Sequence, residues 1–368
     1  MRDSIREEIE SKVYSGARLS PEEGIALFEC DDLAFLGRLA NVIRERKNGD
    51  NAYFNVNRHI NLTNVCTSKC KFCAFYREPD QEGAYTMTVR EAVQAALESS
   101  PLGITELHIV SALHPDLPFS YYIDVIRELK KALPNVHMQA FTAVEIDYFS
   151  KISGKSVREV LSELKEAGLG SMPGGGAEVF SGRVREAVCS NKASAKRWLE
   201  VMRTAHELGI KSNATMLYGH IETVEERIDH MVKLRELQDE TGGFQSFIPL
   251  AFHPDNTPLS EIRRFERPTA HENLKMIAIS RLMLDNFDHI KAFWIMLGLK
   301  TAQLSLDFGA DDLDGTVVQE KITHAAGAET EEAIEKDEII RIIREAGRIP
   351  VERDTLYNVV KIYDAVVV

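Results

Sequence analysis

Apolar positions recur along the first 50 residues at the spacing of amphipathic helices. The two clearest apolar stripes are Ile5, Ile9 and Val13, and Leu36, Leu39 and Ile43. Between them, Pro21 followed by two glutamates is typical of a helix start. We therefore expect residues 1–50 to form an N-terminal helical extension and residues 51–368 to form the main domain.

From about residue 55, short β-like runs alternate with amphipathic helical patterns. The expected strands are Val56–Thr63, Glu106–Ser111, His137–Thr142, Gly170–Met172, Lys211–Leu217, Gln245–Ala251, Ile290–Ile295 and Gln303–Phe308. The expected helices are Val89–Ser99, Tyr121–Ala132, Ser156–Ala167, Ala193–Leu208, Glu225–Glu240 and His271–Asn286. Strands spaced by helices of this length predict βαβ units and a parallel sheet. About eight such repeats favour an α/β fold of the closed (β/α)8 TIM-barrel type.

Alternate positions of the expected strands collect polar residues, namely His59, Asn61, Thr63, Gln139, Asn213, Thr215 and Gln245. In a barrel this set would point inward. A purely structural interior would carry branched apolar residues there, so a polar interior predicts a cavity for a ligand. A register error of one residue would invert this assignment.

Three of the five cysteines lie close together in NLTNVCTSKCKFCAFYRE, directly after the first expected strand. Cys66, Cys70 and Cys73 can hold three corners of a 4Fe–4S cluster and leave one iron open to a substrate. The alternatives are a zinc-binding structural protein or a non-catalytic Fe–S carrier. Both usually need a fourth nearby Cys or His, and the next His is His108.

Composition excludes some classes of protein. The chain has 368 residues with 44 Lys and Arg against 57 Asp and Glu, a formal net charge of −13. This balance argues against a nucleic-acid partner. No apolar run approaches the ~18 residues of a membrane span, and the charged N-terminus lacks the core of a signal peptide. The few cysteines indicate a reducing compartment, so the expected location is the cytoplasm.

The motif C-x3-C-x-aromatic-C, with Phe72 before Cys73, resembles the signature of the radical S-adenosylmethionine (SAM) superfamily. The resemblance implies a barrel fold in which a 4Fe–4S cluster binds SAM at the open iron and cleaves it reductively. It also implies a reducing protein, such as flavodoxin or ferredoxin, as electron donor. Phe72 and Tyr76 are expected to cover the cluster and the adenine of SAM.

Six further strings are similar to the radical SAM subgroup of menaquinone and deazaflavin biosynthesis. They are SALHPDLPFSYY (111–122), QAFTAVEI (139–146), MPGGGAEVF (172–180), SNATMLYGHIET (212–223), ETGGFQSFIPLAFHPDNT (240–257) and DFGADDLDGT (307–316). Within the subgroup the chain most resembles the aminofutalosine synthases. That resemblance implies addition of the deoxyadenosyl radical of SAM to 3-[(1-carboxyvinyl)oxy]benzoate, an enolpyruvyl benzoate, giving 6-amino-6-deoxyfutalosine, methionine and bicarbonate. The dehypoxanthine futalosine cyclase and an FO synthase component are the alternatives.

Several residues near strand ends are candidates for binding SAM. Glu145 is expected to accept hydrogen bonds from the ribose hydroxyls, although a glutamate that only stabilises a helix N-terminus fits the same position. Asn213 and Thr215 are expected to meet the SAM carboxylate or ribose, and a buried structural hydrogen bond explains them equally well. Ser111 stands where many radical SAM enzymes carry glycine, and its side chain is a candidate for the SAM site.

The remaining candidates concern the substrate and the chemistry. Gly174, Gly175 and Gly176 are expected to form a turn whose N–H groups bind a carboxylate, although such a run is more often a plain turn. His114 and His253 are candidate catalytic residues that could bind the substrate carboxylate or move a proton near neutral pH. Asp307, at the end of the eighth expected strand, is a candidate for substrate binding, with a helix cap or turn as the alternative.

Overall fold

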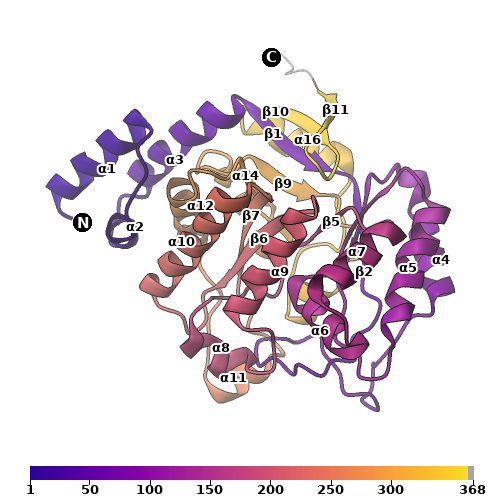
Figure 1. Ribbon diagram of the computed structural model, residues 1–368. Helices are drawn as coiled ribbons and strands as arrows, with labels where there is room; N and C mark the ends of the chain where they lie inside the picture. Colours follow the sequence, from indigo (N-terminus) through magenta and orange to yellow (C-terminus); the bar gives the residue numbers. More distant parts are fainter. Residues whose placement is uncertain (364–368) are drawn as a thin grey trace.

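Seven parallel strands curl in chain order into the central sheet of the molecule (Figure 1). The computed structural model describes residues 1–363. The strands are β2 (Asn57–Ile60), β3 (Glu106–Ile109), β4 (His137–Ala140), β5 (Ser171–Met172), β6 (Lys211–Tyr218), β7 (Phe244–Ala251) and β8 (His289–Ile290). Each pairs in parallel with its neighbour in the chain, as βαβ connections require.

The segment 311–318 closes the sheet into a barrel. Within it, Asp312 pairs in parallel with Lys291 beyond β8, and Val318 pairs in parallel with Arg58 of β2. Backbone hydrogen bonds support both seams, since Ala292 N donates to Asp312 O at 2.8 Å and His59 N donates to Val318 O at 3.1 Å. This segment contains β9 (Asp312–Gly315) and acts as the eighth strand of the barrel. The expected (β/α)8 barrel fold is confirmed.

The helices between the strands follow the amphipathic patterns of the sequence. They are α4 (Val89–Glu98), α5 (Phe119–Ala132), α6 (Ala143–Ser153), α7 (Val157–Ala167), α8 (Gly182–Cys189), α9 (Ala195–Glu207), α10 (Val224–Thr241), α11 (Pro258–Ile262) and α12 (Ala270–Met283). Short helices α13 (Trp294–Leu297), α14 (Leu299–Ser305) and α15 (Ile322–Ala325) flank the closing segment. The expected helices are thus confirmed, with small shifts at their ends.

The eighth expected strand, Gln303–Phe308, is wrong, because α14 and a turn occupy these residues. The apolar pattern of this stretch fits both the period of a strand and the period of a helix. Ala302 and Leu306 are fully buried four residues apart, whereas Leu304 is 53% exposed, so the period is helical. The strand that closes the barrel reads DLDG. Its aspartates make it hard to recognise as a strand in the sequence, because acidic residues are depleted in strands.

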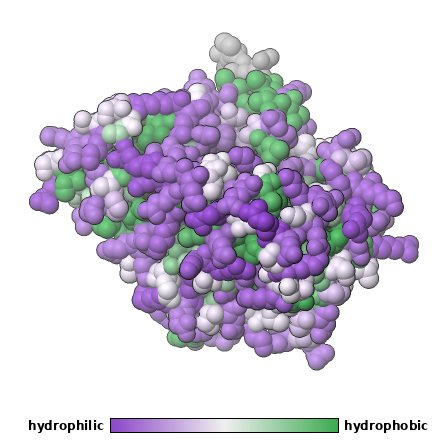
Figure 2. Space-filling model, in the orientation of Figure 1, coloured by the Kyte–Doolittle hydropathy of each residue, from purple (hydrophilic) through white to green (hydrophobic). Residues whose placement is uncertain are grey.

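A second sheet, in the order β11-β10-β1-β9, crosses the N-terminal end of the barrel strands (Figure 1). Strand β1 (Asn51–Asn55) runs parallel to β9 and to β10 (Ile349–Arg353), and β11 (Val359–Ile362) returns antiparallel along β10. Helix α16 (Lys336–Glu345) precedes β10. Val359, Val360 and Ile362 of β11 are each more than half exposed, and Figure 2 shows hydrophobic side chains at this end of the molecule.

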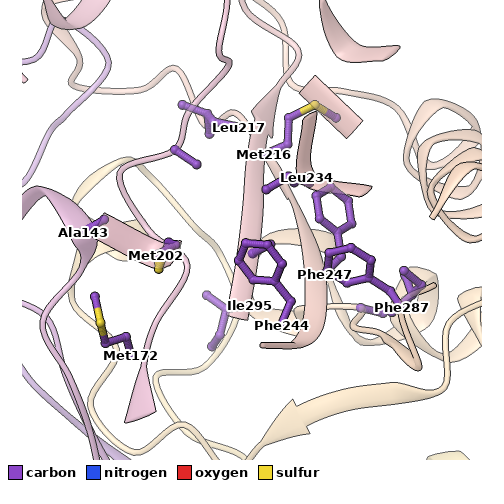
Figure 3. Close-up of a cluster of buried hydrophobic side chains, with 14 of the residues drawn as sticks. Ala143, Met172, Met202, Met216, Leu217, Leu234, Phe244, Phe247, Phe287 and Ile295 are labelled. Atoms are coloured by element: carbon purple, nitrogen blue, oxygen red, sulfur yellow. The ribbon is translucent and has the colours of Figure 1, made fainter. Parts of the chain in front are cut away.

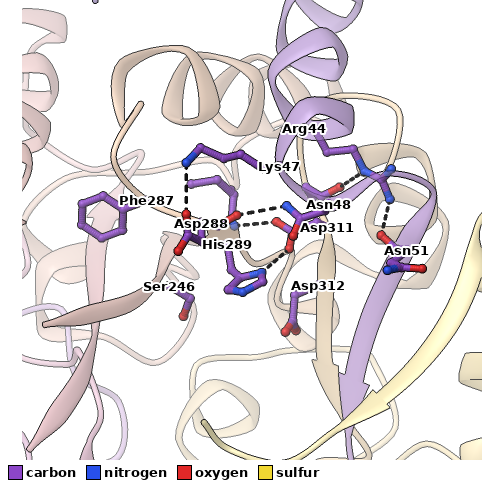
Figure 4. A network of polar contacts seen from close by, with 12 residues as sticks. Arg44, Lys47, Asn48, Asn51, Ser246, Phe287, Asp288, His289, Asp311 and Asp312 are labelled. Atoms are coloured by element: carbon purple, nitrogen blue, oxygen red, sulfur yellow. Dashed lines mark hydrogen bonds and ion pairs between the residues drawn. The ribbon is translucent and has the colours of Figure 1, made fainter. Parts of the chain in front are cut away.

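Three helices precede β1, namely α1 (Asp3–Ser15), α2 (Pro21–Phe28) and α3 (Leu33–Asn48). Helix α2 begins as the sequence indicates, with Pro21 in its first turn and a capping box between Ser20 and Glu23. Figure 4 shows how the end of α3 meets the barrel. Lys47 Nζ pairs with Asp288 Oδ1 at 3.1 Å, and Arg44, which is fully buried, donates from Nη2 to Asn51 O at 2.6 Å.

The main apolar core lies between the outer face of the sheet and the surrounding helices. Figure 3 shows Phe244 and Phe247 of β7 close to Phe287, with Leu234 of α10 nearby. The Phe244 and Phe287 rings stack with centroids 5.5 Å apart, and all of these side chains are buried. Among residues 1–363, no helix is long and apolar enough to cross a membrane.

The inner face of the barrel carries a belt of polar side chains. His59 stacks on His108 with ring centroids 4.5 Å apart, and His108 Nδ1 lies 3.0 Å from Gln139 Oε1. The belt continues to Asn213, whose Oδ1 accepts a hydrogen bond from Ser246 Oγ at 2.9 Å. The inward parity expected for His59, Gln139 and Asn213 is confirmed.

Gln245 does not belong to this belt. A register shift between Ser212 and Asn213 places Ser246 opposite Asn213, which moves Gln245 out of the inward set. Its Nε2 instead donates to Thr355 O at 3.0 Å. The bulge inverts the parity at this one position, because an extra residue in one strand changes which side chains face the partner.

Candidate active site

A cavity of about 290 Å³ opens at the carboxyl ends of the barrel strands. This is the end at which barrel enzymes place their catalytic groups. The chemically active side chains on its wall are Cys66, Cys70, Cys73, Glu145, Glu178, Lys192 and His253. Residues far apart in the sequence therefore meet in one space, as the βα-loop positions predicted.

The loop after β2 carries the three cysteines and is held in place by its own backbone. Lys71 N donates to Val188 O at 2.9 Å at the end of α8, and Lys71 O accepts from Leu259 N at 2.7 Å in α11. The Arg77 guanidinium donates to Ala74 O at 2.9 Å and to Tyr76 O at 2.8 Å. These bonds fix the loop without using the cysteine side chains.

The three thiols are free and line one wall of the cavity. Leu113 N donates to Cys66 Sγ at 3.5 Å. Burial raises the pKa of the Cys70 and Cys73 thiols, so binding of a metal group must displace their protons. In residues 1–363 no three His, Cys, Asp or Glu side chains are grouped as ligands of one metal ion. Thiols spread along a wall fit separate corners of a cluster.

An ion pair that the sequence did not reveal lies next to the cysteines. Lys192 Nζ and Glu178 Oε1 are 2.7 Å apart, and the side chains are 15% and 9% exposed. Lys192 also lies over the Phe72 ring, 5.0 Å from its centroid. Burial alone would lower the pKa of Lys192, but Cys70 and Glu178 outweigh it and raise that pKa well above the ordinary value. The cavity therefore has a permanent cation beside its thiols.

Glu145 occupies the N-terminal turn of α6 and is 2% exposed. Its Oε2 accepts bonds from Thr142 N at 2.7 Å and Thr142 Oγ1 at 2.8 Å, which completes a capping box. Its Oε1 accepts from Ser111 N at 2.9 Å. Burial raises the pKa of Glu145 to about 7, although these bonds act in the opposite direction. Glu145 is thus both a helix cap and part of the cavity wall.

Phe72, Tyr76 and Ser111 also line the cavity. Phe72 and Tyr76 come from the cysteine loop, on either side of Cys73. Ser111 lies just beyond β3, where its Oγ accepts a hydrogen bond from Thr63 N at 3.2 Å. The structure therefore brings these three candidates together with the cysteines.

The triple glycine lies in the loop that follows β5, and α8 begins later, at Gly182. Gly175 and Gly176 line the cavity, whereas Gly174 lies behind it. A Cβ on Gly174 would lie 2.7 Å from the Ala214 carbonyl carbon, and one on Gly176 would lie 2.4 Å from Val144 Cγ2. Close packing therefore requires glycine at both positions.

The two candidate histidines lie in different surroundings. His253 lines the cavity, and its Nε2 donates to Met296 O at 3.0 Å. Burial lowers the pKa of His253, so the ring is neutral and its Nδ1, which is buried without a partner in residues 1–363, carries a lone pair. His114 is not part of the cavity wall. Its Nδ1 accepts from Asp116 N at 3.1 Å within the loop.

Three other candidates lie outside the cavity. Asn213 and Thr215 point into the barrel below it, where Thr215 Oγ1 donates to Gly174 O at 2.7 Å. Asp307 is not at a strand end, because the strand expected before it is helix α14. Its Oδ1 accepts from Arg348 Nη2 at 2.8 Å, near the start of β10. The expectation that Asp307 reaches the substrate is therefore not supported.

A parallel barrel with a three-cysteine loop after its first strand defines a class of enzyme. Residues 60–234 match the model of the radical SAM superfamily, and residues 241–366 match that of the CofH/MqnC C-terminal region. The chain thus belongs to the radical SAM superfamily, as a radical enzyme of the transferase type. Membership implies a 4Fe–4S cluster and SAM.

Individual relatives show which members of the superfamily this chain is similar to. The aminodeoxyfutalosine synthase of Thermus thermophilus is 52% identical and covers 100% of this chain and 99% of its own. That of Streptomyces coelicolor is 49% identical over 99% of this chain and 96% of its own. A Methanopyrus kandleri relative, 44% identical over 89% of each chain, is named 5-amino-6-(D-ribitylamino)uracil–L-tyrosine 4-hydroxyphenyl transferase.

Solved structures support the fold. The hydrogenase maturase HydG of Carboxydothermus hydrogenoformans superposes with a TM-score of 0.76 at 17% identity, over 96% of this chain and 81% of its own. Methylornithine synthase PylB superposes with a TM-score of 0.73 at 17% identity, over 93% and 97%. At these identities the likeness concerns the fold alone.

Proposed function

We propose that this chain is an aminodeoxyfutalosine synthase. It would add the 5′-deoxyadenosyl group of SAM to 3-[(1-carboxyvinyl)oxy]benzoate and release methionine and bicarbonate, as one step of menaquinone biosynthesis. The observation that carries this proposal is identity of 52% and 49% along the whole chain to two relatives of that name. The cavity supplies the required thiols, a buried carboxylate and a buried cation in one space.

In this proposal Cys66, Cys70 and Cys73 hold three irons of the 4Fe–4S cluster. Their free thiols and shared wall fit that role. When bound, the cluster supplies the electron that cleaves SAM. A small reducing protein, such as a flavodoxin or ferredoxin, would deliver that electron. The fixed backbone of the loop holds the thiols at the cavity before any metal arrives.

The wall residues would orient SAM. Within residues 1–363, Glu145 Oε1 has one donor, Ser111 N, and a carboxylate oxygen can accept more than one bond, so it can take a ribose hydroxyl. Lys192 offers a positive charge to the carboxylate of SAM, and Phe72 and Tyr76 cover the apolar parts. His253 would accept a proton at Nδ1, the nitrogen with a free lone pair.

An anaerobic assay with reconstituted protein, dithionite, SAM and the enolpyruvyl benzoate tests the function. An adduct that retains the adenosyl group is expected. Free 5′-deoxyadenosine without an adduct would contradict the proposal and favour hydrogen abstraction, as in the cyclase. The variant Cys70→Ala is the control, because it should lose iron and activity while its unfolding transition persists.

The relative from Methanopyrus kandleri gives a second candidate, because its name records another acceptor at 44% identity. The same assay with L-tyrosine and 5-amino-6-(D-ribitylamino)uracil separates the two. Transfer of a 4-hydroxyphenyl group would replace the first proposal. Turnover with the enolpyruvyl benzoate alone would retain it.

A further inference from the structure

The polar belt inside the barrel ends in a pair of stacked imidazoles whose bonding is incomplete. Among residues 1–363, His59 Nε2 is buried without a hydrogen-bond partner. The other members of the belt are satisfied, since Gln139 bonds with His108 and Ser171, and Asn213 bonds with Ser246. A buried polar atom without a partner costs about 1–3 kcal/mol, so this position is suited to a ligand.

The imidazole pair lies directly below the cavity. On β3, Val110 lines the cavity, and His108 is the preceding inward residue, about 7 Å lower along the strand. The same order holds on the facing strands, where Leu217 and Leu250 line the cavity above Asn213 and Ser246. A ligand that extends downward from the cavity therefore passes the level of Thr215 and then reaches the pair.

Space remains in the barrel at this level. The side chain of His108 is 22% accessible although it points into the barrel from a strand that is paired on both sides. The His108 ring is therefore not fully covered by protein atoms. Its uncovered surface and the unpartnered nitrogen of His59 lie together, because the two rings stack at 4.5 Å.

The pair offers a ligand one hydrogen-bond donor, which is on His59. His108 Nδ1 faces Gln139 Oε1, while the Gln139 amide nitrogen faces Ser171 Oγ at 3.3 Å. Gln139 Oε1 therefore accepts and His108 Nδ1 donates. Burial, with a smaller effect of His108, lowers the pKa of His59 to about 3, so this ring is neutral and keeps one N–H. An acceptor on the ligand complements that N–H.

Each acid around this space already has a partner, which leaves the pair available to an anion. The pairs are Glu106 with the amide of Asn55, Glu320 with His324, Asp312 with Arg353, and Asp314 with Lys291. Lys291 and Arg353 are buried cations. A ligand carboxylate would thus enter a region in which three of these four acids are paired with cationic side chains.

We propose that His59, held in place by stacking on His108, binds the ring carboxylate of an aryl carboxylate substrate, whose aromatic ring descends into the barrel. This inference rests on the proposed function. There the enol-ether double bond must lie beside SAM in the cavity, so the ring carboxylate, at the other end of the molecule, points toward the imidazoles. His59 would then be a specificity-determining residue.

A comparison of two substrates tests the proposal. The second substrate is the phenyl analogue, which lacks the ring carboxylate. For His59→Phe we expect kcat/KM with the enolpyruvyl benzoate to fall roughly 10- to 100-fold, the range for a hydrogen bond to a charged group. Activity with the phenyl analogue should be unchanged. His59→Gln, which returns an N–H donor to this region, should recover most of the loss.

A binding measurement without SAM separates this inference from the proposed function. Calorimetric titration of 3-hydroxybenzoate and of phenol into the protein should show that His59→Phe weakens only the benzoate. His206→Phe is the matched control, since His206 is a half-buried imidazole of α9, outside the barrel, with both nitrogens bonded. It should leave the preference for benzoate intact.

Two outcomes would overturn the inference. Equal losses with both substrates would mean that His59 only supports the fold, and undiminished benzoate binding by His59→Phe would place the carboxylate elsewhere. An inactive wild-type protein that still shows His59-dependent benzoate binding would instead contradict the proposed reaction while the carboxylate site stands.

Discussion

Single residues of the cavity wall are constrained by space as much as by chemistry. Gly176 has a φ of +82°, a conformation that L-residues with a side chain avoid. A Cβ there would also overlap Val144 Cγ2 at 2.4 Å. Glu178 adopts a φ of +49° and carries the carboxylate that pairs with Lys192. The wall between β5 and α8 thus contains one position that requires glycine and one strained residue, Glu178, and such strain is common at functional sites.

Replacement of Gly176 by Ala is expected to lower the free energy of unfolding by about 2–4 kcal/mol. The cost combines a left-handed backbone with an overlap against Val144. Urea unfolding measures it. The control is Gly182→Ala, because Gly182 has open space around its Cα and begins a helix, where Ala should be neutral or favourable by up to about 1 kcal/mol. Equal effects of the two changes would contradict the packing argument.

Glu145 is expected to make stability depend on pH. Its pKa is raised from 4.5 to about 7 in the folded protein, so between these values only the folded state holds the proton. Stability from this group is fully present below pH 4.5 and is lost as the pH rises to about 7. Relative to Glu145→Gln, the wild-type free energy of unfolding should fall by up to about 3 kcal/mol.

Urea titrations across this range, without SAM, provide the measurement. Glu91 occupies the same capping-box position in α4 but is exposed, and its hydrogen bonds with Thr88 lower its pKa. Its contribution should therefore be lost as the pH falls, so Glu91→Gln should show the opposite trend. Parallel curves for wild type and Glu145→Gln would show that Glu145 is not buried as described.

The cluster ligands could be inferred from the sequence, but their electrostatic surroundings could not. The three cysteines lie within eight residues, so local spacing alone reveals them. Lys192 and Glu178 are 14 residues apart on either side of α8, and only the fold places them beside Cys70. Nothing in the spacing of a lone lysine and a lone glutamate distinguishes a buried pair from two solvated charges.

At the scale of elements, the closing strand shows why sequence patterns find most of this fold but not all of it. In long helices such as α5 and α9, the apolar positions recur with an unambiguous helical period. The start of the closing segment is acidic. Its aspartates, Asp311, Asp312 and Asp314, are tolerated because Arg281, Arg353 and Lys291 neutralise them. Such distant ion pairs leave no local signal. Strands β1 and β10 were missed for a related reason, since each is stabilised by a partner almost 300 residues away.

Helix α3 is expected to be held on the barrel by Arg44 more than by its exposed charges. Arg44 is fully buried and donates to the carbonyl oxygens of Gly49, Asn51 and Ala310. Arg44→Met should leave these acceptors unpaired and lower the free energy of unfolding by roughly 3 kcal/mol. Thermal and urea unfolding test this.

Lys47→Met is the matched control on the same helix. Lys47 pairs with Asp288, whose side chain is 77% exposed, and exposed ion pairs contribute less than about 1 kcal/mol. A larger effect for Lys47 than for Arg44 would mean that surface charge, rather than the buried guanidinium, joins α3 to the barrel.

For the whole molecule, the two matched family regions do not correspond to two folding units. The radical SAM match ends at residue 234 and the C-terminal match begins at 241, so the junction falls inside α10 (Val224–Thr241). The C-terminal region supplies β7, β8 and the closing segment, which are consecutive strands of one barrel. One continuous sheet spans both regions.

A chain that ends at residue 240 is therefore expected not to fold cooperatively. It would expose the edges of β6 and β2 together with the apolar face that β7 covers. Far-UV circular dichroism during urea titration should show a broad transition, whereas the full chain should give a sharp one. A sharp transition with an m-value suited to 240 residues would contradict this expectation.

Because segment 311–318 closes the barrel, the barrel can be completed only late in the synthesis of the chain. Asn57 accepts a hydrogen bond from Val317, 260 residues later in the chain. At 5–20 residues per second, a ribosome needs roughly 13–50 s to cover that distance. During this interval the three thiols have no completed barrel around them and stand open to oxidation. The nascent cysteines are thus exposed to oxygen for as long as the ribosome takes to reach the segment that closes the barrel.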